Sequence, residues 1–178
     1  MTGDFVITRE HLLALGACID GVEFFDRTYQ DGRAEYQDML DKAVDGGHTD
    51  YASWLLAKIG PTEDTLEVDE INSADTDVVF AGSIRVRTRI VVGCIEAGGG
   101  IEAGRGIEAG GGIEAGDGIK AGRGIEAGEG IEAGRGIEAG WGFGVYAGLH
   151  VRITETDHRT IKAASKPDNI MCGVWEDA

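Results

Sequence analysis

The stretch that decides the fold begins at Ile95 and repeats every six residues, as IEAGGG, IEAGRG, IEAGGG, IEAGDG, IKAGRG, IEAGEG and IEAGRG, and then as IEAGWG from Ile137. These eight units share isoleucine at the first position, alanine at the third and glycine at the fourth and sixth. Self-similarity at a fixed short period indicates a stacked array of equivalent units. The sequence therefore predicts a β-solenoid over this segment.

Each unit has the chemistry of a short strand followed by a corner. In an extended Ile-Glu-Ala segment, side chains alternate, so that isoleucine and alanine point inward and glutamate points outward. We expect Gly-x-Gly to form the corner because glycine reaches backbone angles that other residues avoid. The variable fifth position then lies exposed on the corner.

Three units per coil would give a triangular, 18-residue turn, which we prefer. This arrangement stacks Glu96, Glu114 and Glu132 in one column, and it stacks Glu102, Lys120 and Glu138 in another. Lys120 then relieves a like-charge stack, because like charges directly opposite each other destabilise paired strands. It also places Asp117 beside Arg135, and Arg105 beside Arg123. A two-sided coil of 12 residues is the alternative.

The pattern continues beyond the perfect units. Ile84 and Ile90 are six residues apart, and Ile95 follows after five, which predicts a one-residue slip. On the other side, Phe143 and Leu149 are expected to keep the register. Alternating runs then predict closing strands, namely LHVRI (149–153), TIKAAS (160–165) and NIMCGVW (169–175). Because an open solenoid end is a sticky edge, we expect helices to cover one end and these strands the other.

The N-terminal segment predicts a small helical module. Residues 8–28 form one helix or two short ones, with Thr8 as a cap and an apolar face from Leu12, Leu13, Leu15, Cys18 and Ile19. A second helix is expected over 34–44, and a third follows a cap at Thr49 or Asp50 and stops at Gly60-Pro61. Six aromatic residues would supply the core, namely Phe24, Phe25, Tyr29, Tyr36, Tyr51 and Trp54.

The predicted fold class is therefore α+β, with two parts. Residues 1–65 form the acidic helical module, and residues 66–178 form the hexapeptide-repeat β-solenoid with its C-terminal capping strands. Handedness and oligomeric state stay open at this point, and a homodimer is possible.

Charge suggests the kind of partner. The chain has a net charge of −16, of which −13 lies in residues 1–79. Such a chain repels nucleic acid and anionic membranes, so we expect no direct contact with either and a basic protein surface as the partner. The candidate partner-binding residues are Asp20, Glu23, Asp38, Asp41, Asp45 and Asp50. The competing interpretation is a solvated face that only keeps the protein soluble.

The motifs of common enzymes are largely missing. The left-handed β-helix acyltransferases resemble this repeat, but they carry a small residue at the fifth position, where this chain has arginine, aspartate, glutamate or tryptophan. His150 or His158 could act as a general base, although exposed histidines usually have no such role. The Walker lysine motif, HExxH, the nucleophile elbow and the calcium-binding repeat are absent. We therefore expect no catalytic residues, no cofactor and no metal.

Cysteine usage and hydropathy bear on location. The three cysteines are far apart and odd in number, which favours a reduced cytoplasmic protein over a disulfide scaffold. The sequence also shows neither the pattern of a signal peptide nor an apolar stretch of membrane-spanning length.

Several stretches resemble an uncharacterised family of phage and bacterial proteins. They are GACIDGVEFFDR and DYASWLLAKIGP in the N-terminal segment, IEAGRGIEAGWG in the repeat, and GVYAGLHVRI and KPDNIMCGVW after it. The resemblance implies a phage or mobile-element origin and, by association, an inhibitor of host defence of the anti-CRISPR type. The expected function is therefore a non-enzymatic acidic inhibitor that occupies a basic nucleic-acid-binding surface. A rigid structural solenoid is the alternative, and an acyltransferase is a third hypothesis.

Overall fold

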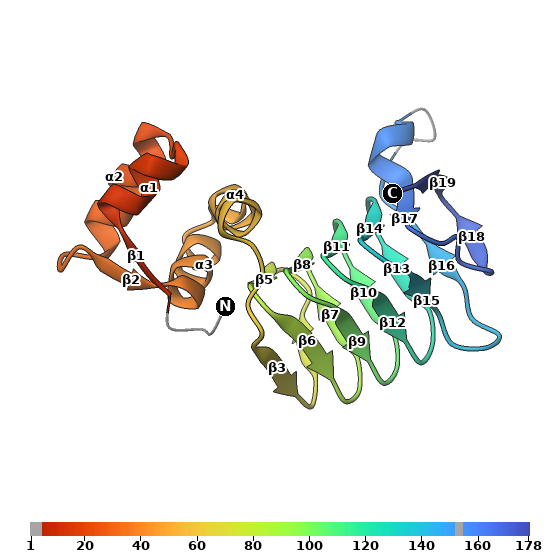
Figure 1. The fold of residues 1–178 in the computed structure, drawn as a ribbon. Coiled ribbons are helices and arrows are strands. Elements are labelled where there is room, and N and C mark those ends of the chain that lie inside the picture. Colours follow the sequence, from red (N-terminus) through yellow and green to blue (C-terminus); the bar gives the residue numbers. More distant parts are fainter. Residues whose placement is uncertain (1–4, 152–154) are drawn as a thin grey trace.

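The computed structural model describes residues 5–151 and 155–178. Four helices come first in the chain, and a three-sided solenoid of parallel strands follows (Figure 1). The helices lie beside the first coils, and the C-terminus lies at the far end of the solenoid (Figure 1). This arrangement confirms the predicted α+β fold with a β-helix.

The helical module contains a small two-stranded sheet as well as its helices. Its elements are β1 (Val6–Thr8), α1 (Arg9–Leu15), α2 (Ile19–Thr28), β2 (Arg33–Glu35), α3 (Tyr36–Asp45) and α4 (Thr49–Ile59). The Thr8 hydroxyl accepts a hydrogen bond from the His11 N–H at 3.3 Å, as expected of a cap. Gly16 has a φ of +83° and ends α1, so the segment 8–28 forms two helices.

Several details of the module differ from expectation. The helix predicted over 34–44 is α3, and it begins at Tyr36 because residues 33–35 pair with β1 and bury Ala34 against Ile7. The helix predicted to follow a cap at Thr49 or Asp50 is α4, but His48 occupies its cap position. The Thr49 hydroxyl instead donates to Asp77 Oδ2 at 2.6 Å. Tertiary partners thus override the local cap signals. Of the six aromatic residues, Phe25 and Tyr36 are fully buried, and the other four are partly exposed.

Parallel strands form the three faces of the solenoid. Face 1 consists of β3 (Thr65–Val68), β6 (Ser83–Val86), β9 (Ile101–Ala103), β12 (Ile119–Ala121) and β15 (Ile137–Glu138). Face 2 consists of β4 (Ile71–Ser73), β7 (Ile90–Val92), β10 (Ile107–Ala109), β13 (Ile125–Ala127), β16 (Val145–Tyr146) and β18 (Ile170–Cys172). Face 3 consists of β5 (Val78–Phe80), β8 (Ile95–Ala97), β11 (Ile113–Ala115), β14 (Ile131–Ala133), β17 (Thr160–Ala163) and β19 (Val174–Asp177).

The strand register confirms the 18-residue coil and excludes the two-sided alternative. Glu114 stands between Glu96 and Glu132 on face 3, and Lys120 stands between Glu102 and Glu138 on face 1. Lys120 Nζ lies 3.1 Å from Glu138 Oε2. The expected neighbours Asp117 and Arg135 form an ion pair at 3.1 Å.

The inside of the solenoid is a ladder of isoleucine and alanine. The first-position isoleucines from Ile95 to Ile131 are at most 1% exposed, and the third-position alanines are also buried. The glutamates between them point outward, as predicted. Isoleucine supplies most of the apolar surface that each coil buries, and that burial is the main favourable contribution to stacking.

The corner glycines are required for a different reason from the one expected. None of the glycines between Gly60 and Gly142 has a positive φ. Instead, a Cβ atom on Gly122 would overlap the carbonyl oxygen of Gly104 in the preceding coil, and Gly116 and Gly134 show the same relation to their neighbours. The expectation that these positions need left-handed angles is therefore wrong. Close backbone stacking excludes the side chain.

The register changes at both ends of the perfect repeat. Val78 pairs with Ile95, and Ile84 pairs with Ile101, which confirms a coil shortened to 17 residues. After Ile137 the expectation fails, because Val145 rather than Phe143 pairs with Ile125. Two extra residues at this corner turn the chain outward and leave both Phe143 and Leu149 about 45% exposed.

The closing strands agree with two of the three predicted runs. TIKAAS forms β17, and NIMCGVW forms β18 and part of β19. Residues 149–151 of LHVRI form no strand, and residues 152–153 lie outside the described residues. A short 3-10 helix, η1 (Thr156–Arg159), precedes β17, so that 30 residues separate the paired Ile131 and Ile161.

The helical module is joined to the solenoid along β5. Val78 and Phe80 point into the solenoid, whereas Val79, 4% exposed, packs into the core of the helical module. The Gln37 carboxamide binds the outer backbone edge of β5, and the Ser53 hydroxyl donates to a carboxylate oxygen of Glu96. The module therefore lies against face 3 and covers the β5 part of the first coil.

Candidate interaction surface

The six predicted partner-binding residues are all exposed, on three different helices. Asp20 and Glu23 lie on α2, Asp38, Asp41 and Asp45 lie on α3, and Asp50 lies on α4. The structure divides them into two groups with different surroundings.

The α3 group is partly engaged inside the module. Asp38 Oδ2 accepts a hydrogen bond from the Tyr29 hydroxyl at 2.7 Å, and Asp41 Oδ1 accepts one from Gln37 Nε2 at 2.8 Å. Burial, followed by the neighbouring charges of Asp38 and Asp45, raises the pKa of Asp41 against the opposing effect of the Gln37 hydrogen bond. Asp38 and Asp41 thus help to hold the fold, and they are less suited to a partner than the sequence suggested.

The second group consists of Asp20, Glu23 and Asp50, and Asp50 lies at the edge of an apolar pocket that the sequence analysis did not predict. The pocket has a volume of about 280 Å³ and is lined mainly by Leu12, Ala17, Cys18, Met39, Tyr51, Trp54 and Leu55, with Asp50 at its edge. The pKa of the Tyr51 hydroxyl is raised by desolvation and then by the nearby Cys18, Asp20 and Asp50. Asp50 lies at the edge of the pocket, and Asp20 is near enough to Tyr51 to affect its pKa. Glu23 is exposed one helical turn after Asp20.

Two exposed apolar side chains follow pocket-lining residues in the chain. Leu13 is 51% exposed and Ile19 is 77% exposed, although both were expected on the buried face of the first helices. Each directly follows a pocket-lining residue in the chain, namely Leu12 and Cys18. Gly16 breaks the helical segment between α1 and α2. This break at Gly16 was the one available sign of the pocket in the sequence.

The helical module carries less net negative charge than the count of −13 over residues 1–79 implied. Residues 1–65 hold 13 acidic and 5 basic residues, a net charge of −8. The other acidic residues of the segment 1–79 belong to the first coil of the solenoid, where Glu67, Asp69 and Glu70 form ion pairs at 2.6–2.8 Å. Their partners are Arg85, Arg87 and Arg89, which therefore do not serve the helical module.

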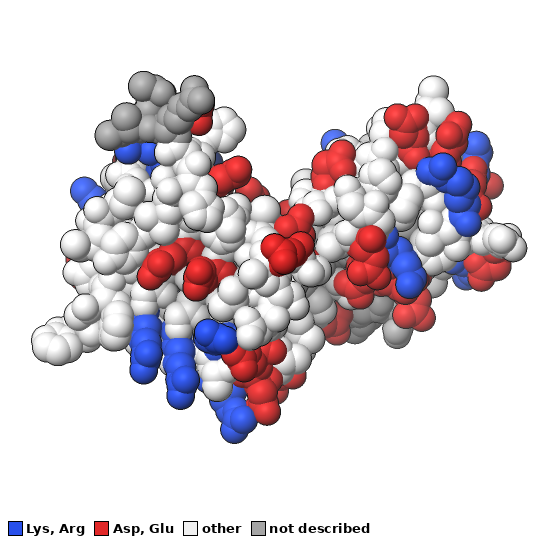
Figure 2. All heavy atoms as spheres, turned by 180° about the vertical axis from the view of Figure 1, so that it is seen from behind, with Lys and Arg blue, Asp and Glu red and all other residues white. Residues whose placement is uncertain are grey.

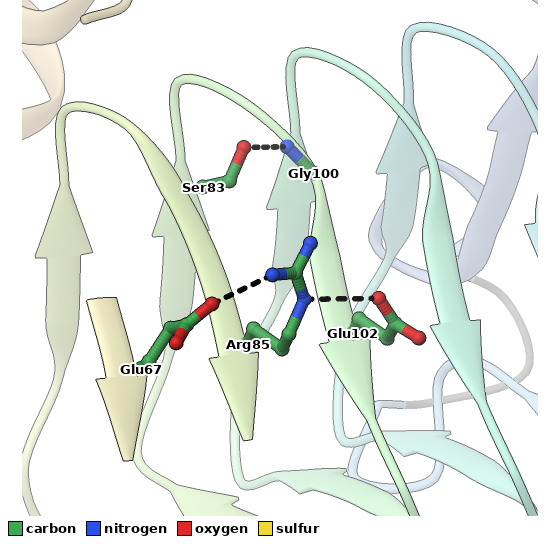
Figure 3. Close-up of polar contacts among 5 residues, drawn as sticks. All are labelled: Glu67, Ser83, Arg85, Gly100 and Glu102. Carbon is green, nitrogen blue, oxygen red and sulfur yellow. Dashed lines mark hydrogen bonds and ion pairs between the residues drawn. The ribbon is translucent and has the colours of Figure 1, made fainter. Parts of the chain in front are cut away.

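Arg85 illustrates how face 1 neutralises itself. Its guanidinium lies 2.7 Å from Glu67 Oε1 and 3.4 Å from Glu102 Oε2, and so it bridges three consecutive coils (Figure 3). The Ser83 hydroxyl beside it accepts the Gly100 N–H at 3.2 Å (Figure 3). Face 1 is thus a ladder of alternating charge, which leaves little net field for a partner.

The histidines lie apart from one another. His11 stacks on Phe5, and His48 stacks on Tyr51 with ring centroids 4.7 Å apart. His150 Nδ1 lies 2.9 Å from the Gly110 carbonyl oxygen, and His158 lies in η1. Within residues 5–151 and 155–178, no three histidine, cysteine or acidic side chains are grouped to hold a metal ion.

Comparisons with protein-family models, with curated proteins and with solved structures give no match. The resemblance to a phage family and the anti-CRISPR class therefore remain predictions. Across the part of the chain that the structure describes, no helix is long and apolar enough to cross a membrane.

Proposed function

We propose that the chain is a non-enzymatic interaction protein whose helical module occupies a basic, nucleic-acid-binding surface of a host protein in the cytoplasm. An inhibitor of the anti-CRISPR type, encoded by a phage or a mobile element, would act in this way. The observation that carries the proposal is the apolar pocket, with Asp50 at its edge. The helices α1 and α2, which also line it, carry the exposed residues Leu13, Ile19, Asp20 and Glu23.

This arrangement has the anatomy of a protein interface. Interfaces combine an apolar centre that takes up anchor side chains with a polar rim that remains accessible to water. Here the rim is acidic, so a partner would bring an apolar anchor flanked by lysine or arginine. Opposite charge across the rim increases the association rate and the specificity more than it increases the affinity.

Co-purification from host lysate tests the proposal when two charge-reversal variants are compared. The first replaces Asp20, Glu23 and Asp50 by lysine. The second replaces Glu63, Asp75 and Glu129, which are also exposed, so its net charge changes by the same amount. We expect only the first variant to lose a basic protein that wild type captures, and we expect short duplex DNA or high salt to release that protein. Equal capture by both variants, or capture insensitive to DNA, would contradict the proposal.

A further inference from the structure

One face of the solenoid and its adjoining corner carry charges that form no ion pair with the residues that the structure describes. Arg105 and Arg123 occupy the same corner, between faces 1 and 2, in consecutive coils, and the Arg123 N–H donates to the Arg105 carbonyl oxygen at 3.1 Å. Glu108 and Glu126 are direct neighbours on face 2. All four side chains are exposed, and none forms an ion pair with any residue that the structure describes.

This pattern contrasts with face 1 and with the corner between faces 3 and 1. Face 1 alternates in charge, and the corner that carries Asp117 and Arg135 is paired. By contrast, two arginines and two glutamates here form adjacent rows of like charge, and strand neighbours of like charge destabilise a sheet. Figure 2 shows basic side chains gathered along the lower edge of the solenoid.

Aromatic side chains lie at the end of the same rows. The turn from Gly140 to Phe143, closed by a 2.9 Å hydrogen bond, contains the two extra residues that break the repeat. It places Trp141 at the tip with 99% of its surface exposed, and Phe143 at 45%. Gly142 has a φ of +81°, as the third position of a type II turn requires. The insertion thus presents aromatic residues instead of burying them.

A groove of about 600 Å³ connects the charged rows with Phe143, and Trp141 lies two residues before Phe143 in the same turn. Arg105, Arg123, Glu108, Glu126, Phe143 and Tyr146 line it. Interfaces are enriched in tryptophan, tyrosine, phenylalanine and arginine, and exposed apolar patches commonly mark binding sites. The groove lies at the one corner that does not border face 3, so the helical module leaves it open.

We propose that this groove is the interface of a homodimer with a twofold axis parallel to the solenoid axis. A twofold interface requires a self-complementary surface. A twofold rotation about this axis places each coil of the second copy at the level of the same coil in the first. It also sets the arginine row of one copy opposite the glutamate row of the other. Arg105 then faces Glu108 of the second copy, Arg123 faces Glu126, and Trp141 meets the aromatic side chains at the end of the groove. An antiparallel arrangement would instead bring arginine against arginine.

The chemistry favours a second copy over a nucleic acid. The glutamate row lies in the same groove as the arginine row, and the chain carries a net charge of −16, so a polyanion would be repelled. Another copy supplies both signs of charge at the required spacing. This inference is independent of the proposed function, because it uses a different surface.

Light scattering after size exclusion tests the dimer with a pair of complementary variants. Wild type should have twice the monomer mass of 18.8 kDa, with dissociation promoted by salt. Arg105→Glu with Arg123→Glu, and separately Glu108→Arg with Glu126→Arg, should each be monomeric. An equimolar mixture of the two variants should restore a dimer, because the opposing rows are again of opposite charge. Trp141→Ala should raise the dissociation constant by about 30-fold or more.

Controls separate this interface from general effects of charge. Lys42→Glu with Lys58→Glu changes the net charge as the arginine variant does, at exposed sites in the helical module, and should stay dimeric. A monomeric wild type, or variants that still form homodimers, would refute the proposal. A mixture of the two variants that stays monomeric would refute the opposition of these charged rows across the interface.

Discussion

The side chain of Gln37 donates a hydrogen bond to the carbonyl oxygen of Val79 at the open edge of the solenoid. Gln37 Nε2 donates to the Val79 carbonyl oxygen at 2.9 Å, and Gln37 Oε1 accepts the Ala81 N–H at the same distance. The carboxamide therefore replaces the peptide group that a further coil would supply. One side chain both anchors α3 and blocks an edge that would otherwise be available for pairing.

Replacing Gln37 by alanine should destabilise the protein. The substitution leaves the Val79 carbonyl oxygen and the Ala81 N–H without this partner, at a cost of about 1–3 kcal/mol. Urea unfolding measures the effect, with Gln30→Ala at an exposed position as the control. If the two variants unfold at the same urea concentration, the edge-capping role is wrong.

The inward isoleucines should tolerate no charge. Ile119 is 1% exposed and lies in the middle of the stack, so Ile119→Asp would bury a carboxylate without a partner. We expect a loss of about 3–5 kcal/mol, or failure to fold. Glu129→Gln, on an exposed corner, should leave the melting temperature almost unchanged.

The corner glycines should be sensitive to size rather than to backbone angle. A side chain at Gly122 meets the Gly104 carbonyl oxygen, so even Gly122→Ala should be destabilising, by about 1–3 kcal/mol from overpacking. Gly112→Ala provides the comparison, because a Cβ atom there would lie 3.6 Å from the nearest carbonyl oxygen. Equal melting temperatures for the two variants would argue against the close-stacking explanation.

Much of the repeat could be predicted from its sequence, although the choice of an 18-residue coil over a 12-residue one needed the strand register of the structure. Inward isoleucine, outward glutamate and the neutralising position of Lys120 require only the period and strand alternation. The ends were harder to predict. The two residues inserted near Trp141 follow a perfect IEAG unit, and nothing local distinguishes an outward turn there from a continuing coil.

The candidate surfaces depended on tertiary packing and were predicted only in part. The exposure of Asp20 and Asp50 was expected from their charge, but the pocket between them forms only when α1 and α2 pack on α3 and α4. Likewise, Asp41 looked free in the sequence, whereas the fold places Gln37 against it. Charge counted along the chain also assigned the acids of the first coil to the wrong module, since strand pairing brings Glu67 to Arg85.

The glutamate column on face 3 should make stability depend on pH. Desolvation, followed by the charges of Glu96 and Glu132, raises the pKa of Glu114 above its ordinary value of 4.5. The folded chain therefore holds this proton more tightly than the unfolded chain, so the contribution of Glu114 to stability is greatest below pH 4.5 and is lost as the pH rises through the folded-state pKa. Glu114→Gln removes the repulsion permanently. We expect it to stabilise the protein at pH 7 by about 0.2–1 kcal/mol, and this gain should vanish as the pH falls to 4.5. Urea unfolding at several pH values measures both effects, with Glu129→Gln as the matched control. A gain that is constant with pH would mean that the substitution acts through something other than the titration of Glu114.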